Sequence, residues 1–570
     1  MKKFWKAKNY TVAAVFSDHM VLQRNKWMAI FGEAENDTII TASLYDKNGA
    51  LLSTNSTICE NQRWELQLEP QTAQTGCTLF ISDGKDEINF SDIAIGEVWL
   101  AGGQSNMEFE LQNCTEGPEE LKDDAAGRNV RFYYTNKIAW MDDHFYEAES
   151  KTAWQKWDSH ARGAWSAVGY FFAKKLAEDL DCVVGLIGCN WGGTSASAWM
   201  RKEYLEADRD LNTYLTDYEE ATRGKSIEEQ CKEYDDYEIE NAKWQEKFSK
   251  LWEKQPGITW AEAEKILGKN PWPGPASCKN PYRPNGLYDC MLSRIAPYTL
   301  KGVLWYQGES DDHKPRYYAK LFTSMIENWR QDWKDAALPF VFVQLPVHRY
   351  EADPDFKHWC LVREQQAKVH ASVKNTWLTG CFDLGQFSDI HPRAKKVLAE
   401  RMEKNALANV YNLIPSVDAA APQYEGCHQL YDKTADEGST AQGKLLLTFS
   451  NAPLGFEVRS DEVRLEEYKK MEANQGTPVP EDFTGFEIAG SDGVWYPAEF
   501  AFGGTDGKQN LIVLCSKKAK HPVAARYGWF NYGPVTIYGK NGIPLCPFQT
   551  QEFNNGTADS HAKIQQIMTV

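Results

Sequence analysis

The spacing of apolar and polar positions changes twice along the chain and divides it into three parts. Between residues 12 and 90, short β-rich runs alternate with turn residues, which is typical of antiparallel strands. From Ile93 onward, apolar strands alternate with loops and amphipathic helices. After about residue 414 the short β-type runs return. We therefore predict a β-sandwich-like domain at 1–91, an α/β domain at 92–413 and a β-rich domain at 414–570.

The middle part has the pattern of a parallel sheet with helices on both faces. Ser166 can cap an apolar helix that runs through Leu180. Further helices are expected at about 315–333 and 393–407. Apolar runs predict buried strands at 94–101, 183–189, 301–307, 340–345 and 377–382. The predicted fold class is a three-layer α/β/α arrangement with a β-domain at each end.

A strongly charged helical segment at about 202–279 interrupts this alternation. The runs Ser226-Ile-Glu-Glu229 and Thr259-Trp-Ala-Glu262 match capping boxes, which open helices. Trp244 and the aromatic residues at helical spacing after it are expected to pack in a core rather than contact a ligand. The run Pro271-Trp-Pro-Gly-Pro275 reads as a turn-rich join. We predict that this segment is an insertion into the α/β domain.

Composition disfavours several classes of function. The formal net charge of −18 would repel nucleic acid and anionic membrane surfaces. No run approaches the ~20 apolar residues of a membrane helix. The amino terminus lacks the apolar stretch of a secretory signal, which predicts a cytoplasmic protein, or a secreted or periplasmic one if a leader was removed. The 13 cysteines form no CxxC pair and no zinc-like spacing, which predicts reduced thiols.

The clearest chemical signal is a serine in a glycine-rich turn directly after the first buried strand. Gly102 and Gly103 permit a sharp turn that would expose the hydroxyl of Ser105. The amide side chains of Gln104 and Asn106 flank that serine. Ser105 is therefore a candidate nucleophile. The alternative is an ordinary strand-to-helix turn in which Ser105 is only a cap.

Three other loops supply the remaining groups that acyl transfer requires. His391 lies in a polar turn after the last strand and is a candidate general base. Gly193, after the strand at 183–189, can direct its backbone N–H into a cleft. Gln307 ends the strand at 301–307 and can offer side-chain N–H donors to an oxyanion. The carboxyl ends of parallel strands are where such folds place ligands.

These motifs resemble those of the SGNH (GDSL-like) hydrolase superfamily, and within it the sialate O-acetylesterase-like carbohydrate esterases. The runs that carry the resemblance are Gly103-Gln-Ser-Asn-Met107, Asn190-Trp-Gly-Gly-Thr194, Trp305-Tyr-Gln-Gly-Glu-Ser310 and Asp389-Ile-His-Pro392. The resemblance implies a serine esterase that removes O-acetyl groups from sugars through an acetyl-enzyme. It implies Ser105 as nucleophile, His391 as base, an oxyanion hole of Ser105, Gly193 and Gln307, and no metal or cofactor.

The acidic member of the site departs from the wider superfamily. Its Asp-x-x-His spacing would place the carboxylate at position 388, where this chain has Ser388, and Asp389 is one residue closer to His391. Side chains two apart in an extended segment point the same way, so Asp389 is a candidate to orient the imidazole. The alternative is a backbone carbonyl near Ser388, which would make the site a dyad.

The substrate is less constrained by the sequence than the reaction. Arg363 would favour an anionic sugar such as a sialic acid if it faced the site, and so would Arg393. A cleft lined by aromatic residues without a cation would favour neutral acetylated polysaccharides such as xylan. An inactive carbohydrate-binding protein is the rival from another class. The residues considered for substrate binding are Gln104, Asn106, Trp191, Glu309 and Arg363, and for an aromatic lining Trp191, Trp199 and Tyr306.

Overall fold

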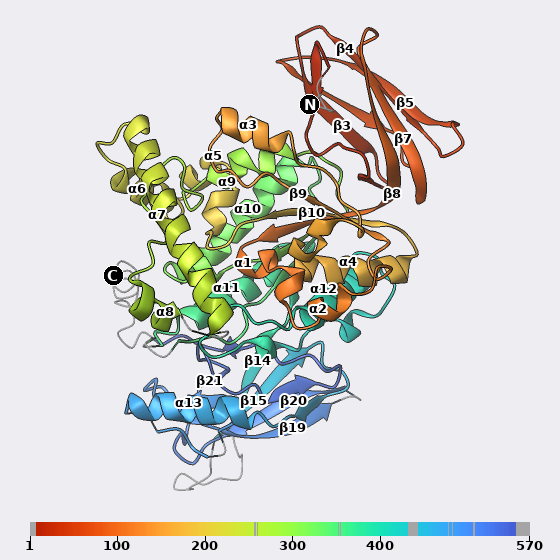
Figure 1. Ribbon diagram of the computed structural model, residues 1–570. Helices are drawn as coiled ribbons and strands as arrows, with labels where there is room; N and C mark the ends of the chain where they lie inside the picture. Colours follow the sequence, from red (N-terminus) through yellow and green to blue (C-terminus); the bar gives the residue numbers. More distant parts are fainter. Residues whose placement is uncertain are drawn as a thin grey trace.

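The computed structural model describes residues 7–255, 258, 260–350, 353, 355–430, 443–476, 478–481, 483–505 and 508–553. Figure 1 shows a red and orange β-region at one end, an α/β region in the middle and a blue β-region at the other end. The predicted fold class, an α/β sheet domain with flanking β-domains, is confirmed.

Six parallel strands form the centre of the molecule. Each of the five strands expected from the apolar runs is present, and a sixth, β9, was not predicted. In order across the sheet the strands are β9 (Val130–Tyr134), β10 (Val184–Asn190), β8 (Glu87–Gly103), β11 (Gly302–Tyr306), β12 (Phe340–Val343) and β13 (Thr376–Thr379).

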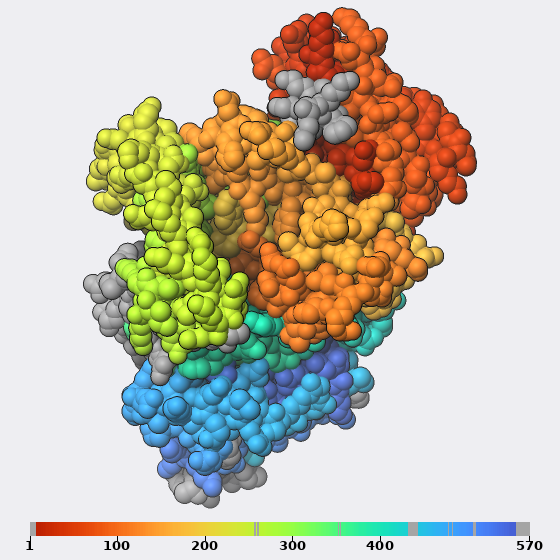
Figure 2. All heavy atoms as spheres, in the orientation of Figure 1, coloured from red at the N-terminus to blue at the C-terminus, as the bar shows by residue number. Residues whose placement is uncertain are grey.

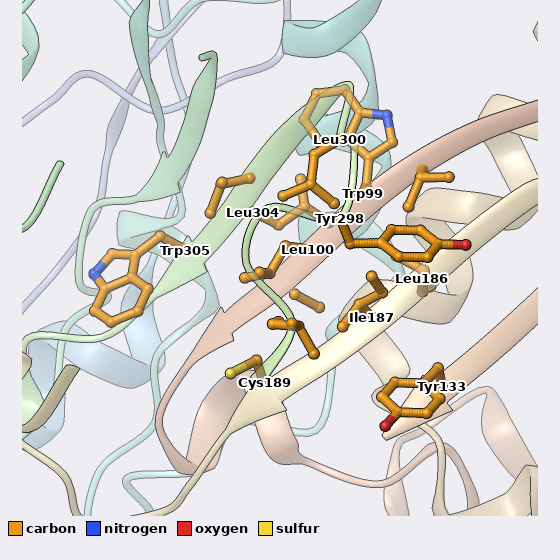
Figure 3. Close-up of a cluster of buried hydrophobic side chains, with 14 of the residues drawn as sticks. Trp99, Leu100, Tyr133, Leu186, Ile187, Cys189, Tyr298, Leu300, Leu304 and Trp305 are labelled. Atoms are coloured by element: carbon orange, nitrogen blue, oxygen red, sulfur yellow. The ribbon is translucent and has the colours of Figure 1, made fainter. Parts of the chain in front are cut away.

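Helices cover both faces of this sheet. Trp99 of β8 packs on Phe172 of one helix, whereas Trp305, level with Gly102, stacks on Phe322 of another. Because successive strand residues point to opposite faces, the two helices lie on opposite sides. Figure 3 shows Trp99 and Trp305 among the apolar side chains of these strands. The helices of the layers are α4 (Ala167–Leu180) and α12 (Lys395–Asn409), which pack together, and α10 (Tyr318–Asp332) and α11 (His358–Ser372).

Strand β8 links the amino-terminal β-region to the central sheet. Its first half pairs antiparallel with β7, and its second half pairs parallel with β10 and β11. The boundary proposed at residues 91 and 92 therefore falls inside one continuous strand. The other strands of this region are β1 (Tyr10–Val12), β2 (Val21–Gln23), β3 (Met28–Ala34), β4 (Ile39–Tyr45), β5 (Leu51–Ile58), β6 (Arg63–Leu68) and β7 (Gln74–Ser82).

The charged segment that interrupts the α/β pattern is helical, as predicted. Ser226 and Glu229 form both hydrogen bonds of a capping box at the start of the longest helix. Trp244 is buried and stacks on Phe248, so its role is packing. The second expected capping box begins at residue 259, outside the described residues. The helices are α5 (Lys202–Glu206), α6 (Asn212–Ala221), α7 (Ile227–Lys254) and α8 (Trp260–Leu267).

Among its described residues, the carboxy-terminal region contains two four-stranded sheets, a two-stranded sheet and one α-helix that the apolar pattern did not predict. That helix, α13 (Glu462–Asn474), is rich in charged residues and buries Tyr468 against the sheets, so its apolar side is narrow. The strands are β14 (Gln423–Leu430), β15 (Lys444–Ser450), β16 (Phe456–Val458), β17 (Phe486–Ala489), β18 (Trp495–Pro497), β19 (Glu499–Thr505), β20 (Lys508–Cys515), β21 (Ala524–Tyr527), β22 (Ile537–Gly539) and β23 (Phe548–Gln549).

Short helices occupy the connections around the sheet. They are α1 (Ser105–Glu108), α2 (Gly117–Glu120), α3 (Asp143–Glu149) and α9 (Gly286–Cys290). No helix in the described ranges combines the length and apolar character needed to cross a bilayer.

Candidate active site

Three strands of the central sheet end level with one another at the candidate site. Gly103 at the end of β8 pairs with Asn190 of β10 on one side and with Tyr306 of β11 on the other. Gly103 has φ +137°, and a Cβ on it would lie 2.1 Å from Tyr306 O. Only glycine fits this close approach. The geometry places the loops after all three strands beside one another.

Ser105 and His391 meet above this edge of the sheet. Ser105 is the first residue of α1, and His391 lies in the loop before α12. The Ser105 Oγ and His391 Nε2 atoms are 2.8 Å apart, which is hydrogen-bond distance. Although 286 residues separate them in sequence, the fold brings the candidate nucleophile and the candidate base into direct contact.

The environment of His391 keeps its imidazole neutral. Burial, followed by the charge of Lys395, lowers the pKa of His391 to about 4, while Asp389 and Glu108 act in the opposite direction. The ring also lies against Phe109, with 6.3 Å between the ring centroids. A neutral imidazole can accept the Ser105 proton, although a lowered pKa makes it a weaker base than an imidazole in water.

Asp389 contacts the backbone of His391. Its Oδ1 accepts a hydrogen bond from the His391 backbone N–H over 2.9 Å. Ser388 has φ +58°, so the segment turns here instead of remaining extended. Within the described residues, the only hydrogen bond of the imidazole itself is the one to Ser105, so neither Asp389 nor a carbonyl near Ser388 is hydrogen-bonded to the ring.

Two backbone N–H groups near Ser105 are available for an oxyanion. Those of Ser105 and Gly193 donate to no acceptor in the described part of the chain. The loop of Gly193 is close to the serine, because a Cβ on the preceding Gly192 would lie 3.2 Å from Ser105 Cβ. Gly193 has φ +76°, a conformation that favours glycine.

Gln307 lies at the predicted strand end, but its side chain is already engaged. Its Nε2 donates to Thr194 O over 3.0 Å and to Asp311 Oδ2 over 2.7 Å, and its Oε1 accepts from Tyr318. Both amide protons are therefore used within the fold. Gln307 is fully buried and ties the glycine loop to the loop after β11.

Glu108 holds the glycine loop against Ser105. Its Oε2 accepts the Gly192 N–H over 2.7 Å, and its Oε1 pairs with Lys137. Because Glu108 is one turn after Ser105 on α1, the contact fixes the serine relative to the loop of Gly193. In the sequence, the only signal that Glu108 holds the glycine loop is its position, three residues after Ser105.

A buried polar network lies beneath the Ser105–His391 pair. Asn106 Nδ2 donates to Glu309 Oε1 over 2.7 Å and to Ile390 O over 2.9 Å, and Asn106 Oδ1 accepts from Lys395. The Lys395 ammonium also lies 4.8 Å from the centroid of the Phe109 ring. Burial lowers the pKa of Lys395 to about 7 and raises that of Glu309. Asn106 and Glu309, considered as substrate contacts, are thus internal supports of the loop that carries His391.

Arg363 was considered as a partner for a substrate carboxylate, and the structure places it elsewhere. It is completely buried, and its guanidinium donates to the backbone oxygens of Pro346 and Phe530 and lies over the Phe382 ring. It therefore joins the α/β region to the carboxy-terminal region rather than facing a sugar. Its burial argues against the pairing of Arg363 with a substrate carboxylate.

The two other residues considered for substrate binding remain near Ser105. Gln104 is buried, and its Oε1 accepts the Ser310 N–H over 3.2 Å, which ties the loop after β11 to α1. Trp191 is half-buried, and its backbone N–H donates to Gly103 O. Of the other aromatic residues considered for the cleft, Trp199 and Tyr306 are fully buried in the core.

The level strand ends, the Ser105–His391 contact and the nearby N–H groups together form a site in a three-layer α/β fold whose geometry suits acyl transfer. Comparison with known families narrows the class of the protein. The family model described as "Carbohydrate esterase, sialic acid-specific acetylesterase" matches residues 95–253 and 274–407, together more than half of the chain. The chain belongs to this family and is a carboxylic ester hydrolase.

Individual relatives agree with the family match. The mouse sialate O-acetylesterase is 25% identical over 429 residues, which cover 70% of this chain and 74% of the mouse protein. The human sialate O-acetylesterase is 24% identical, and the match covers 70% of this chain and 71% of the human protein. A solved structure, a carbohydrate acetylesterase from Xanthomonas citri, shares the fold with a TM-score of 0.68 and 23% identity, covering 95% of this chain and all of the other.

The contact between Asp389 and the His391 backbone predicts a mild effect of Asp389→Asn. The amide oxygen can still accept the His391 N–H, so we expect kcat/KM for an acetyl ester to fall less than about tenfold. Replacement of a carboxylate that orients the ring costs about 10⁴-fold in a well-studied triad. The measurement is steady-state kinetics beside Asp418→Asn, a change at an exposed position of the short 3-10 helix Ser416–Asp418. A loss of 10³-fold or more would show that Asp389 acts on the imidazole.

The buried charge of Lys395 predicts a shift in the pH profile. The base must be neutral, so kcat/KM should rise as pH increases through the His391 pKa, near pH 4 in the native protein. Lys395→Met removes a positive charge that disfavours the imidazolium, so the acid limb should move to higher pH. The control is Lys396→Met, at the adjacent, more exposed position. An acid limb that stays in place, or moves to lower pH, would contradict this role of Lys395.

Proposed function

We propose that this protein is a serine esterase that removes O-acetyl groups from sugars, with sialic acids as the preferred class of substrate. The observation that carries the proposal is the 2.8 Å contact between Ser105 Oγ and His391 Nε2 at the carboxyl ends of the central strands. The membership of the chain in the sialic acid-specific acetylesterase family supports the choice of acetyl group and sugar.

In the proposed reaction, His391 Nε2 takes the Ser105 hydroxyl proton as Ser105 Oγ attacks the acetyl carbonyl carbon. The resulting oxyanion lies near the backbone N–H groups of Ser105 and Gly193. The imidazolium then donates its proton to the sugar oxygen as the bond between that oxygen and the acetyl carbon breaks. Water, deprotonated by the same imidazole, attacks the acetyl-enzyme, and Ser105 recovers its proton as acetate leaves.

The proposed oxyanion hole has two backbone donors, and Gln307 has a supporting role in it. Gln307 Nε2 is bonded to Thr194 O, one residue after Gly193, so it fixes the loop that carries the second donor. For Gln307 to donate to the oxyanion itself, it would have to give up its bond to Thr194 O or to Asp311. His391 acts without a carboxylate bonded to its ring, so the proposed machinery is a Ser–His dyad.

A neutral acetylated polysaccharide, such as acetylated xylan, is the second candidate substrate. The observation that favours it is the complete burial of Arg363, which removes the cation considered as partner for a sialate carboxylate. Arg393 is exposed two residues after His391 and is the remaining arginine considered for that carboxylate. An inactive binding protein is less well supported, because the Ser105–His391 contact is intact.

Ser105→Ala tests the proposed function. Acetate release from 9-O-acetylated sialic acid and from acetylated xylan should be followed in parallel, with faster release expected from the sialic acid. Loss of the nucleophile should lower kcat by at least about 10³-fold on whichever ester is cleaved. Ser372→Ala, at an exposed position at the end of α11, is the matched control and should keep full activity. Unchanged activity of Ser105→Ala would exclude the proposed mechanism. Faster acetate release from acetylated xylan than from the sialic acid would show that a neutral polysaccharide is the preferred substrate.

A further inference from the structure

An exposed tryptophan stands against the glycine loop of the candidate site. The side chain of Trp272 is 51% exposed. A Cβ on Gly193 would lie 3.2 Å from Trp272 Cζ2 and 2.9 Å from Tyr282 Cε1, so both rings close against this loop. Because a Cβ on Gly192 would be equally close to Ser105, the pair Gly192 and Gly193 lies between the indole and the candidate nucleophile.

The indole is held in a defined orientation. Its Nε1 donates to the Tyr282 hydroxyl over 2.7 Å, and the two rings meet edge to face with centroids 5.9 Å apart. The Tyr282 hydroxyl thus accepts one hydrogen bond and keeps its own proton, for which no acceptor is present among the described residues. The pair offers an apolar ring face and a hydroxyl donor on the same side of the site.

The segment that carries Trp272 is tied down at several points. Asn280 Nδ2 donates to Pro273 O over 3.3 Å and to Pro275 O over 2.9 Å, and Asn280 Oδ1 accepts the Tyr282 N–H. Gly274 packs on the Tyr237 ring of α7, where a Cβ would come within 2.6 Å. The exposed indole therefore belongs to a fixed element. An aromatic face held in place before binding loses little entropy when a ligand stacks on it.

We infer that Trp272 and Tyr282 form a subsite for the sugar ring of the ester substrate, the ring stacking on the indole while the Tyr282 hydroxyl donates to a sugar oxygen. This inference rests on the proposed function, since it concerns the alcohol part of the same ester. The position fits, because the same short loop contacts Ser105 through Gly192 and the two rings through Gly193. Figure 2 shows the surface hollowed between the yellow-green insertion and the orange segment around α1.

The chemistry of the pair fits a pyranose ring better than a second protein or a lipid. A sugar presents C–H groups on one face, which stack on an aromatic ring, and hydroxyls at its edge, which pair with a polar group. Trp272 has the first property and Tyr282 the second. The helical insertion therefore contributes the sugar-binding wall of the cleft, while the sheet contributes Ser105.

The test compares two esters that share the acetyl group. 9-O-acetylated sialic acid has the sugar ring, whereas ethyl acetate has an alcohol too small to reach the indole. Trp272→Ala should lower kcat/KM for the sugar ester by about three- to tenfold, mainly through KM, and leave ethyl acetate unchanged. Trp272→Phe, which keeps an aromatic face, should recover part of the loss. Trp27→Ala, at a similarly exposed tryptophan in the amino-terminal region, is the control.

Calorimetric titration of Ser105→Ala with the same sugar ester, with and without Trp272→Ala, separates binding from turnover. Weaker binding of the sugar ester by the variant that carries both Ser105→Ala and Trp272→Ala supports the subsite. If the wild type hydrolyses no ester but this difference in binding is found, only the esterase proposal fails. Equal binding in both proteins, equal loss on the two esters, or an unchanged rate for the sugar ester would overturn the subsite. Equal loss on both esters would show that Trp272 only supports the loop of Gly193.

Discussion

The close packing of backbone at Gly103 is the constraint on which the site depends. Tyr306 O occupies the space that a side chain at this position would need, and the Gln104 N–H donates to that same oxygen. On the other side, the Trp191 N–H donates to Gly103 O. These contacts bring the three loops after β8, β10 and β11 to one point and place Ser105 above them. The position of Ser105 thus depends on Gly103, which has no side chain.

Polar groups buried beneath the site determine the state of its base. Burial of an ammonium group is costly unless it is hydrogen-bonded, and Lys395 satisfies this condition through Asn106. Asn106 in turn holds Ile390 O, the carbonyl directly before His391. One network therefore holds the segment that carries the imidazole, while burial and, after it, the positive charge of Lys395 lower the pKa of His391. The lysine beneath the ring disfavours the imidazolium, whereas the carboxylate of a triad stabilises it.

The sequence predicted what local pattern determines and missed what depends on distant packing. Strand periodicity and the glycine turn indicated the parallel sheet and the place of Ser105 correctly in outline. Arg363 could not be placed, because its burial depends on Phe530 in another part of the chain. Trp272 looked like part of a turn, since nothing local indicates that the insertion folds back on Gly193. The engagement of the Gln307 amide likewise depends on Asp311 and Thr194 meeting around it.

Detection of the acetyl-enzyme tests the central claim most directly. Wild-type protein mixed with an acetyl ester and quenched in acid within the first turnovers should carry one acetyl group, and peptide mass spectrometry should place it on the peptide of β8 and α1 at Ser105. An acetyl group at Ser105 that forms and disappears at the rate of turnover is the predicted result. Turnover without any acetylated serine, or with the acetyl group on another residue, would contradict the account.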